Sequence, residues 1–388
     1  MGVISAIGNT VPENRAALKT GTCGMHPLKH LSSNFADKMP FGEVNISTED
    51  LKKKLNAHEK GVTRTSLLAL HALQEALKNS ALTSVEIQSK DTALIGASTV
   101  GGMCLTDEMY KDANLHSGGS EYLSSYDFAS VSLYLQHRYK INGIVNTINT
   151  ACSSSANSVM YGARLIKHGL AKRAIVGGAD SLAKFTINGF NSLQILSSDI
   201  CKPFDEARKG LNLGEGAAFL VLEKEEDCAG KTIYAELIGY CNSNDAFHPS
   251  SLSEQGDGPF LSMLGALNQA RLHPQAIGFI NAHGTGTENN DAVESTAMLR
   301  LFNNEIPDFA STKSNTGHTL GASGAIEAVY SILNLQHQEV YGGLNFTNPI
   351  STTGLIPVQI YKQKEIHHVL SNSFGFGGNC SSLIFSKV

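Results

Sequence analysis

The sequence predicts a layered α/β protein built from one structural unit that occurs twice. Short apolar runs without polar alternation, the pattern of strands covered on both faces, alternate along the 388 residues with segments of helical periodicity. A glycine turn followed by an apolar strand occurs near the end of each half of the chain. The alternation favours sheets covered by helices, and the repeated turn favours two similar halves.

Eight apolar segments are expected to form the buried strands. They are residues 92–98, 144–148, 174–178 and 217–222 in the first half and 233–238, 277–282, 368–372 and 382–385 in the second. Three other segments place apolar residues three and four positions apart, which predicts amphipathic helices. These helices are expected over residues 65–78, 153–168 and 326–333.

The two halves resemble each other in chain order. The run that begins at Gly214-Glu-Gly corresponds to the run that begins at Gly377-Gly-Asn, and the strand at 94–98 corresponds to the strand at 279–282. The polar segment at 225–231 is suited to a surface crossing between two such units. We therefore predict an N-terminal half over residues 1–228 and a C-terminal half over residues 229–388.

Composition argues against several classes of function. The chain has 30 Lys and Arg against 35 Asp and Glu, a net charge of −5, and no run of like charge, which argues against nucleic acid as a partner. Seven cysteines without a C-x-x-C pair argue against a disulfide framework and a structural zinc site. No apolar stretch reaches the about 18 residues that span a bilayer. We expect a cytoplasmic protein without a membrane span.

Cys152 is the first candidate for chemistry. It lies in Thr147-Ile-Asn-Thr-Ala-Cys152-Ser-Ser-Ser, where an expected strand runs through a turn of small residues into a helix. The first N–H groups of a helix and its dipole favour a thiolate, and the same N–H groups can hold a developing oxyanion. A small buried thiol fits this local pattern as well as a nucleophile does, so the pattern alone leaves both open.

Two histidines lie at the ends of expected elements, among glycines. His283 follows the strand at 277–282, and His318 precedes the helix at 326–333. Such positions let a side chain face a ligand, although structural histidines are the alternative. Neither His318 nor His283 shows metal-ligand spacing, and no glycine-rich phosphate loop opens a helix, so neither a metal nor a nucleotide is expected.

Four motifs together resemble the elongating β-ketoacyl-[acyl carrier protein] synthases. They are Thr150-Ala-Cys152-Ser-Ser, Asn281-Ala-His283-Gly-Thr-Gly-Thr, Lys313-Ser-Asn-Thr-Gly-His318 and Asn372-Ser-Phe-Gly-Phe-Gly-Gly. The similarity extends from the first residues to the last. It implies the thiolase-like fold, in which two pseudo-duplicated βαβαβαββ halves form five layers, α-β-α-β-α. It also implies a dimer with the acyl pocket near the subunit contact.

The resemblance implies a decarboxylative condensation. Cys152 would take an acyl group from a carrier-protein thioester. His283 and His318 would bind the malonyl thioester and stabilise the enolate that forms when carbon dioxide leaves, and this enolate would attack the acyl group on Cys152. Lys313 is implied as electrostatic support near His318, with Glu327 as its acidic partner.

The same resemblance assigns the loop near the C-terminus. The backbone N–H groups of Cys152 and Phe376 would form the oxyanion hole, and Phe376 would act as a gate that Gly375 and Gly377 allow to swing. Substrates would arrive on the phosphopantetheine of acyl carrier protein, so no cofactor and no metal are expected. The expected partners are that carrier protein and a second subunit, in a homodimer or a heterodimer.

Three features depart from the family pattern. The chain starts inside the motif that normally follows the first core strand, so this first N-terminal strand is expected to be absent or replaced. Asn379-Cys380 stands where Thr-Asn is expected, and we interpret Cys380 as a packing residue. The stretch from Leu105 to Phe128 is short for a wall of the acyl pocket.

Asp291 and Glu294 match acidic family positions and are expected to shape their loop.

Two other functions are alternatives to the condensing enzyme, an acyltransferase. A chain-length-factor-like subunit, a catalytically silent partner in a heterodimer, would lack the cysteine that is present at position 152. A degradative thiolase would need a second active cysteine near the C-terminus. The chain-initiating synthases use Cys-His-Asn, whereas His318 occupies the third position. A 3-oxoacyl-[acyl carrier protein] synthase is the main expectation, and its acyl chain length stays open.

Overall fold

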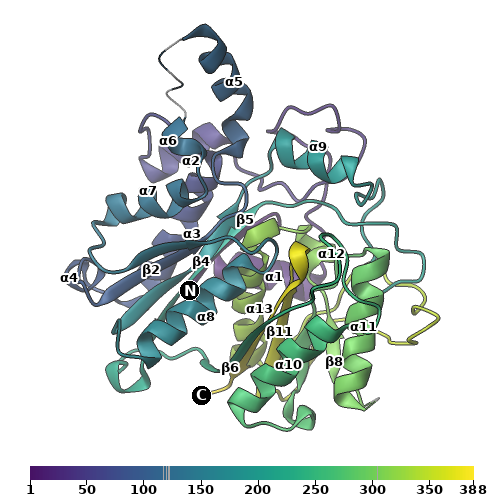
Figure 1. Ribbon diagram of the computed structural model, residues 1–388. Helices are drawn as coiled ribbons and strands as arrows, with labels where there is room; N and C mark the ends of the chain where they lie inside the picture. The colour runs from purple at the N-terminus through teal and green to yellow at the C-terminus, as the bar shows by residue number, and fades with distance from the viewer. Residues whose placement is uncertain (117, 119, 121–122, 304) are drawn as a thin grey trace.

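Two five-stranded sheets with the same strand order form the frame of the molecule. They are seen in a computed structural model that describes all residues except 117, 119, 121–122 and 304 (Figure 1). The first sheet has the order β1-β5-β4-β2-β3, in which β5 runs antiparallel to both neighbours and the other pairs are parallel. Its strands are β1 Gly2–Ser5, β2 Thr92–Ala97, β3 Val145–Ile148, β4 Arg173–Asp180 and β5 Gly216–Glu223.

The second sheet repeats the first, position by position. Its order is β6-β12-β11-β7-β8, and β12, the counterpart of β5, is again antiparallel to both neighbours. Its strands are β6 Glu236–Asn244, β7 Phe279–Asn281, β8 Asp308–Ala310, β11 His368–Phe374 and β12 Asn379–Ser386. The predicted duplication is therefore confirmed, including the correspondence of β5 with β12 and of β2 with β7. The boundary between residues 228 and 229 stays a prediction.

Helices complete a five-layer arrangement. Helices α3 and α7 cover the outer face of the first sheet, α8 and α13 lie between the two sheets, and α10 and α11 cover the second sheet (Figure 1). Their bounds are α3 Arg64–Ser80, α7 Ala129–Tyr139, α8 Ser154–Lys167, α10 Asp257–Ala270, α11 Glu288–Phe302 and α13 Ser323–His337. Helix α13 is buried throughout residues 323–335 because it packs between the sheets. Each half thus reads βαβαβαββ, and the predicted fold class is confirmed.

Shorter elements connect these layers. They are α1 Val11–Thr20, α2 Thr48–Leu55, α4 Ser84–Ile87, α5 Thr106–Leu115, α6 Leu123–Tyr126, α9 Lys184–Ser192, α12 Lys313–Thr316, β9 Glu339–Val340, β10 Lys362–Gln363 and the 3-10 turns η1 Met103–Leu105, η2 Glu225–Asp227, η3 Pro274–Ala276, η4 Leu320–Ala322 and η5 Phe376–Gly378. Two of these turns matter for the site. The η4 turn follows His318, and the η5 turn contains Phe376.

The expectation that the first strand is missing is wrong. Strand β1 pairs antiparallel with β5, from Gly2 opposite Phe219 to Ser5 opposite Gly216. It fills the sheet edge with four buried residues. Helix α3 crosses this strand so closely that a Cβ at Gly2 would lie 2.2 Å from the carbonyl oxygen of Ala72. A strand this short gives no periodic signal, which is why the sequence pattern did not reveal it.

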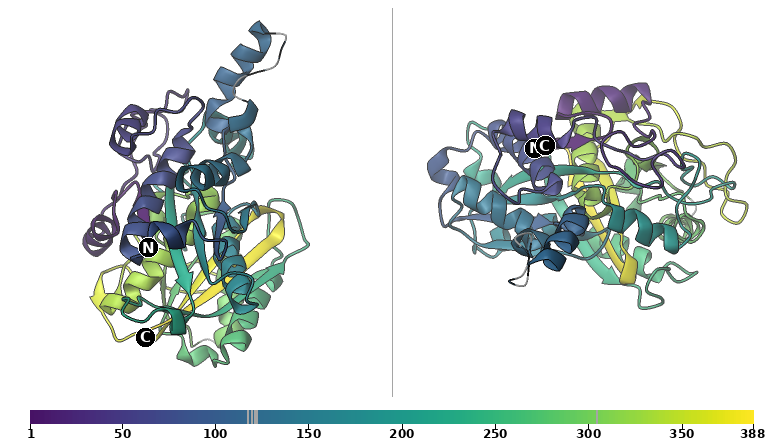
Figure 2. Two further views of the ribbon diagram at one scale, coloured as in Figure 1. Left: turned by 90° about the vertical axis from the view of Figure 1, so that its left-hand side faces the viewer. Right: turned by 90° about the horizontal axis from the view of Figure 1, so that it is seen from above.

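Helix α5 extends away from the body of the molecule. It is the most distant helix from the two sheets in Figures 1 and 2 and has no buried residue. Tyr110 and Leu115 on it are 71% and 78% exposed. Single exposed apolar side chains are normal on a protein surface, so these two residues do not by themselves mark a contact site.

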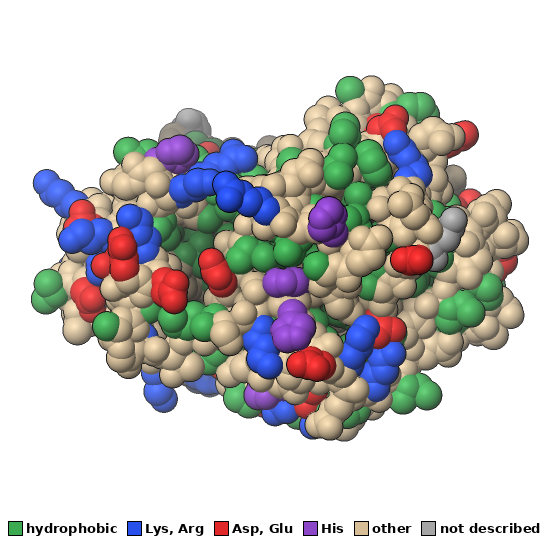
Figure 3. All heavy atoms as spheres, turned by 90° about the horizontal axis from the view of Figure 1, so that it is seen from below, with side chains coloured by type: hydrophobic (Ala, Val, Ile, Leu, Met, Phe, Trp, Pro, Cys, Tyr) green, Lys and Arg blue, Asp and Glu red, His purple; other side chains and the backbone are tan. Residues whose placement is uncertain are grey.

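Acidic, basic and hydrophobic side chains are interspersed on the face shown in Figure 3. Among the described residues, no helix has the length and apolar character needed to cross a membrane.

Candidate active site

A strained turn places Cys152 between β3 and α8, as predicted. Ala151 has φ 53°, in the left-handed region, and turns the chain sharply just before the cysteine. The turn is closed by the Thr150 N–H, which donates to Ser154 Oγ at 2.9 Å. Cys152 is 6% exposed. The turn therefore aims the thiol inward instead of leaving it on the helix surface.

Loop ends bring His283 and His318 to the same place. His283 follows β7, and the buried carboxylate of Glu294 accepts its N–H at 2.9 Å. His318 follows α12, and its N–H donates to the carbonyl of Asn212 at 2.7 Å. The two ring centroids lie 5.4 Å apart, edge to face. The Cys152 sulfur and one nitrogen of each ring all lie within 4.8 Å of one another.

Hydrogen bonds at Nδ1 determine the tautomer of both rings. His283 Nδ1 accepts from Lys313 Nζ at 3.2 Å, and His318 Nδ1 accepts from the Leu320 N–H at 3.0 Å. A neutral imidazole whose Nδ1 accepts carries its proton on Nε2. Burial and then the positive charge of Lys313 hold the pKa of both histidines well below the usual value, so both are neutral near pH 7. Each ring therefore offers an Nε2–H donor.

Lys313 is buried, and its ammonium group has a complete set of acceptors. Besides His283 Nδ1, Nζ donates to the His283 carbonyl at 2.6 Å and to the carboxylate of Glu327. These acceptors use all three ammonium protons. The expected pairing with Glu327 is present, but the direct contact is with His283 and not with His318. The reason is that Lys313 begins α12 and points toward the end of β7, whereas His318 lies beyond the turn at Gly317.

Burial dominates the electrostatics of the thiol. It raises the pKa of Cys152 to about 11, although Lys313 and the backbone N–H groups of Phe376 and of Cys152 itself act in the opposite direction. The helix-start argument predicted a thiolate, so the closed, buried site reverses that expectation. The same two N–H groups that reach the sulfur are those expected to form the oxyanion hole.

The two glycines beside Phe376 have different structural roles. Gly375 is extended, and a Cβ there would lie 2.6 Å from the Thr150 carbonyl, so it allows the loop to approach the nucleophile turn. Gly377 is exposed with φ 79°, a conformation that side chains disfavour. The Phe376 ring stacks on Phe190 of α9, with centroids 5.9 Å apart. The sequence pattern did not predict this aromatic partner.

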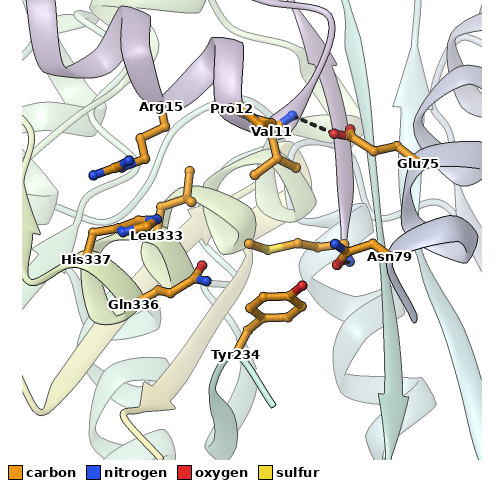
Figure 4. A pocket seen from close by; sticks show the side chains of 10 residues that line it. Val11, Pro12, Arg15, Glu75, Asn79, Tyr234, Leu333, Gln336 and His337 are labelled. Atoms are coloured by element: carbon orange, nitrogen blue, oxygen red, sulfur yellow. Dashed lines mark hydrogen bonds between the residues drawn. The ribbon is translucent and has the colours of Figure 1, made fainter. Parts of the chain in front are cut away.

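A pocket of about 430 Å³ contains the site. Its lining includes Cys152, both histidines and Phe376, and also hydroxyl, amide and charged side chains such as Thr287, Asn289 and Lys209. No described residue of the 105–128 stretch lines it, so this stretch does not form the expected wall within one chain. A second cavity of about 330 Å³ lies between α1, α3 and α13 and contains none of the predicted site residues (Figure 4).

Two family models match consecutive parts of the chain. The model described as beta-ketoacyl synthase, N-terminal domain, matches residues 1–228, and the beta-ketoacyl synthase, C-terminal domain, matches residues 234–347. The chain belongs to the beta-ketoacyl synthase family. The predicted family and enzyme class, an acyltransferase, are thereby confirmed.

Known proteins resemble this ketosynthase over its whole length. The 3-oxoacyl-[acyl-carrier-protein] synthase 2 of Coxiella burnetii is 31% identical, and the match covers 100% of this chain and 97% of the relative. The ishigamide ketosynthase/chain length factor superposes with a TM-score of 0.92 at 28% identity, covering 100% of this chain and 97% of that one. A Xenorhabdus doucetiae ketosynthase, solved in complex with its chain length factor, has a TM-score of 0.83 at 31% identity, with coverage of 100% and 96%.

The three donors of this ketosynthase site are close enough to suggest a metal, but their protonation argues against one. Cys152, His283 and His318 form such a group among the described residues. Lys313 donates to Nδ1 of His283, and the Leu320 N–H donates to Nδ1 of His318. The proton of each ring is therefore on Nε2, and a protonated Nε2 has no lone pair with which to bind a metal. The ammonium group next to His283 also repels a cation. The donor set fits hydrogen bonding to an anion better than metal binding.

Several buried groups of the ketosynthase site were not predicted, or only in part. Asp180, at the end of β4, accepts N–H groups from Thr99, Val100 and Gly321, and so holds the η4 turn whose Leu320 N–H contacts His318. An acidic residue after an apolar strand was the available signal for it. Asp291 and Glu294 were expected to shape their loop, and their carboxylates do accept N–H groups from it.

Proposed function

We propose that this ketosynthase is a 3-oxoacyl-[acyl carrier protein] synthase, which condenses malonyl-carrier protein with an acyl group held on Cys152 and releases carbon dioxide. The name of the Coxiella burnetii relative, matched over the full length of the chain, supports the reaction class. The presence of Cys152 and both histidines argues against a catalytically silent subunit. Cys380 is fully buried among apolar neighbours, which argues against a second active cysteine of the thiolase kind.

The observation that carries this proposal is the pair of Nε2–H donors beside the Cys152 sulfur. Loss of carbon dioxide from a malonyl thioester leaves an enolate whose negative charge resides largely on the thioester oxygen. Two neutral imidazoles, with tautomers fixed by Lys313 and Leu320, each donate an Nε2–H hydrogen bond to that oxygen and stabilise its charge. The enolate carbon then attacks the acyl thioester on Cys152, and the thiol is released.

The preceding acyl transfer uses the other pair of donors. The sulfur of Cys152 attacks the carbonyl carbon of the carrier thioester, and the oxyanion receives hydrogen bonds from the backbone N–H groups of Cys152 and Phe376. The thiol is neutral at rest because burial raises its pKa, so its proton has to leave during the attack. When the tetrahedral intermediate collapses, that proton balances the charge of the departing carrier thiolate.

We propose acyl carrier protein as the partner that delivers both substrates on phosphopantetheine, so that no cofactor and no metal take part. All seven cysteines are free, which supports a reducing compartment such as the cytoplasm.

We further propose that two subunits associate along β3. This strand is the open edge of the first sheet, and Leu133 and Ile144 near it are 54% and 38% exposed. A homodimer is the simplest arrangement, and solved relatives described as paired with a chain length factor make a heterodimer the alternative.

The test is a condensation assay with purified protein, malonyl-carrier protein and a panel of acyl-carrier thioesters of increasing length. The expected product is a 3-oxoacyl-carrier thioester two carbons longer than the acyl donor, with one carbon dioxide released per product. Cys152→Ala should form no product, yet should fold, because alanine fits the buried turn. Failure of the wild-type protein with every acyl donor, alone and with a co-expressed partner subunit, would contradict the proposal.

A further inference from the structure

A cluster of polar side chains joins the nucleophile turn to the start of β12. The amide oxygen of Asn379 is at its centre and accepts from Ser153 Oγ at 2.7 Å and from Asn157 Nδ2 at 2.9 Å. Asn157 Nδ2 also donates to Thr150 Oγ1 at 2.9 Å. Thr150 and Ser153 flank the Ala151-Cys152 pair. The side chain of Asn379 therefore bonds the turn directly on one side of the nucleophile, at Ser153, and through Asn157 on the other side, at Thr150.

The backbone of Asn379 holds a second segment of the site. Its carbonyl accepts the Gly375 N–H at 2.8 Å and thereby closes the loop that contains Phe376. One residue is therefore bonded through its side chain to the segment that carries the Cys152 N–H and through its backbone to the segment that carries the Phe376 N–H. These two N–H groups come from different halves of the fold and share no covalent frame nearby.

Two donors can stabilise an oxyanion only if their separation is maintained. An oxyanion-hole donor contributes about 100-fold to 1000-fold in rate, and displacements on the order of 1 Å can cost about 100-fold. Close contact at Gly375 prevents the two segments from approaching further, since a Cβ there would lie 2.6 Å from the Thr150 carbonyl. The Asn379 side chain supplies the complementary restraint, because it keeps the segments from separating.

We propose that Asn379 is a positioning residue for acyl transfer, an inference that rests on the proposed function. Asn379 sets the spacing between the two backbone N–H donors that bind the oxyanion formed on Cys152. The inference separates the two half-reactions. Acyl transfer depends on this spacing, whereas malonyl decarboxylation depends on the two histidines. Among the described residues, the hydrogen bonds of the Asn379 side chain go to Ser153, Asn157 and Asn242 and not to either histidine.

The experiment measures both half-reactions in the same variant. Asn379→Ala should slow acylation of Cys152 by acyl-carrier thioester about 10-fold to 100-fold, measured by intact mass over time. Its decarboxylation of malonyl-carrier protein, measured without acyl donor, should not fall below that of the wild type. Asn242→Ala is the matched control: Asn242 also donates to Asn379 Oδ1, at 2.7 Å, but is exposed on β6, and the variant should acylate within about twofold of wild type.

Ser153→Ala keeps the proposal testable should Asn379→Ala fail to fold, because it removes the other end of the same hydrogen bond. It should slow acylation and spare decarboxylation. The double variant Ser153→Ala/Asn379→Ala should acylate within about twofold of the rate of Asn379→Ala, since both single changes remove the same Ser153–Asn379 hydrogen bond. Unchanged acylation, or a parallel loss of both half-reactions, overturns the inference. A wild-type protein that no acyl-carrier thioester acylates would instead count against the proposed function.

Discussion

At the scale of single residues, the site depends on how Lys313 divides its three protons. One goes to Glu327, one to the His283 carbonyl and one to His283 Nδ1. The last bond makes His283 an Nε2–H donor. Burial is the larger cause of the lowered pKa of both histidines, and the positive charge of Lys313 adds to it. Lys313 thus fixes the tautomer of His283 and helps burial to keep both imidazoles neutral, while the Leu320 N–H fixes the tautomer of His318.

The histidine roles give the first prediction. In a Cys152→Gln background, which cannot be acylated, malonyl decarboxylation should persist because the imidazoles perform it. Adding His283→Ala or His318→Ala should lower that rate at least about 100-fold, the value of one oxyanion donor. When Cys152 is intact, the His283→Ala and His318→Ala variants should still form the acyl adduct on Cys152. Carbon dioxide release at near wild-type rates in both variants would show that the histidines are structural.

The buried thiol gives a pH prediction. Burial raises the pKa of Cys152 to about 11, so the thiolate fraction at pH 7 is small. The rate of alkylation by iodoacetamide should therefore rise about tenfold per pH unit up to at least pH 9. Peptide mapping distinguishes this adduct from one on exposed Cys23. A plateau in the rate below about pH 8.5 would contradict the role assigned to burial.

At the scale of elements, the loop between β11 and β12 places Phe376 between two glycines that have different surroundings. Gly375 is held against Thr150, whereas nothing lies within 4 Å of the place where a Cβ of Gly377 would be. Phe376 lies between them, lines the pocket and stacks on Phe190. The backbone is hydrogen-bonded on both sides of the ring, because the Gly375 N–H donates to the Asn379 carbonyl and the Gly377 N–H to the Pro249 carbonyl at 2.7 Å. A gating movement would therefore be a movement of the Phe376 side chain.

Phe376→Ala should uncouple the two half-reactions. If the ring delays decarboxylation until an acyl chain is seated, its removal should raise the ratio of carbon dioxide to 3-oxoacyl product above one. The backbone N–H of residue 376 is retained, so the oxyanion hole is preserved. Phe190→Ala, which removes only the stacking partner, is the matched control and should raise the ratio less. Equal ratios in the wild type and in an active Phe376→Ala would count against a gate.

Strands that lie within a longer apolar run were predictable from the sequence, including the short strands β3 and β7, whereas β1 and β8 were not. Strands such as β4 and β5 have eight residues each and stand out by composition, whereas β1 and β8 have four and three. The candidate residues Cys152, His283 and His318 could be named because glycines and small residues mark the loops that carry them. The contact of Lys313 with His283 and the Asn379 cluster could not, because each joins segments at least 30 residues apart in the chain.

At the scale of the whole molecule, Glu339 links the two halves. Arg15 of α1 donates to its carboxylate at 2.8 and 3.0 Å, and Tyr341 and Tyr361 donate at 3.0 and 2.9 Å. Lys19 lies 3.2 Å away. Although burial acts to raise the pKa of Glu339, these donors lower it to about 2. The first half is therefore joined to the second by a charge cluster outside the catalytic site.

This cluster predicts a pH-dependent contribution to stability. A carboxyl whose folded-state pKa is lowered contributes stability that is complete above its unfolded value near 4.5 and is lost as the pH falls toward 2. Glu339→Gln should lower the Tm at pH 7 by about 2–6 °C, and the difference should shrink toward pH 2. Glu49→Gln, in an exposed pair with Lys52, should change the Tm by less than about 1 °C. A Tm difference independent of pH would contradict this assignment.

The most direct test of the account follows one acyl group through one turnover. The protein is mixed with acyl-carrier thioester and freed of excess donor, and the adduct is located by peptide mass mapping before and after malonyl-carrier protein is added. We predict a single acyl adduct on Cys152 that disappears as an equal amount of 3-oxoacyl-carrier product, two carbons longer, is formed. An adduct on another residue, or an adduct on Cys152 that malonyl-carrier protein does not consume, would contradict it.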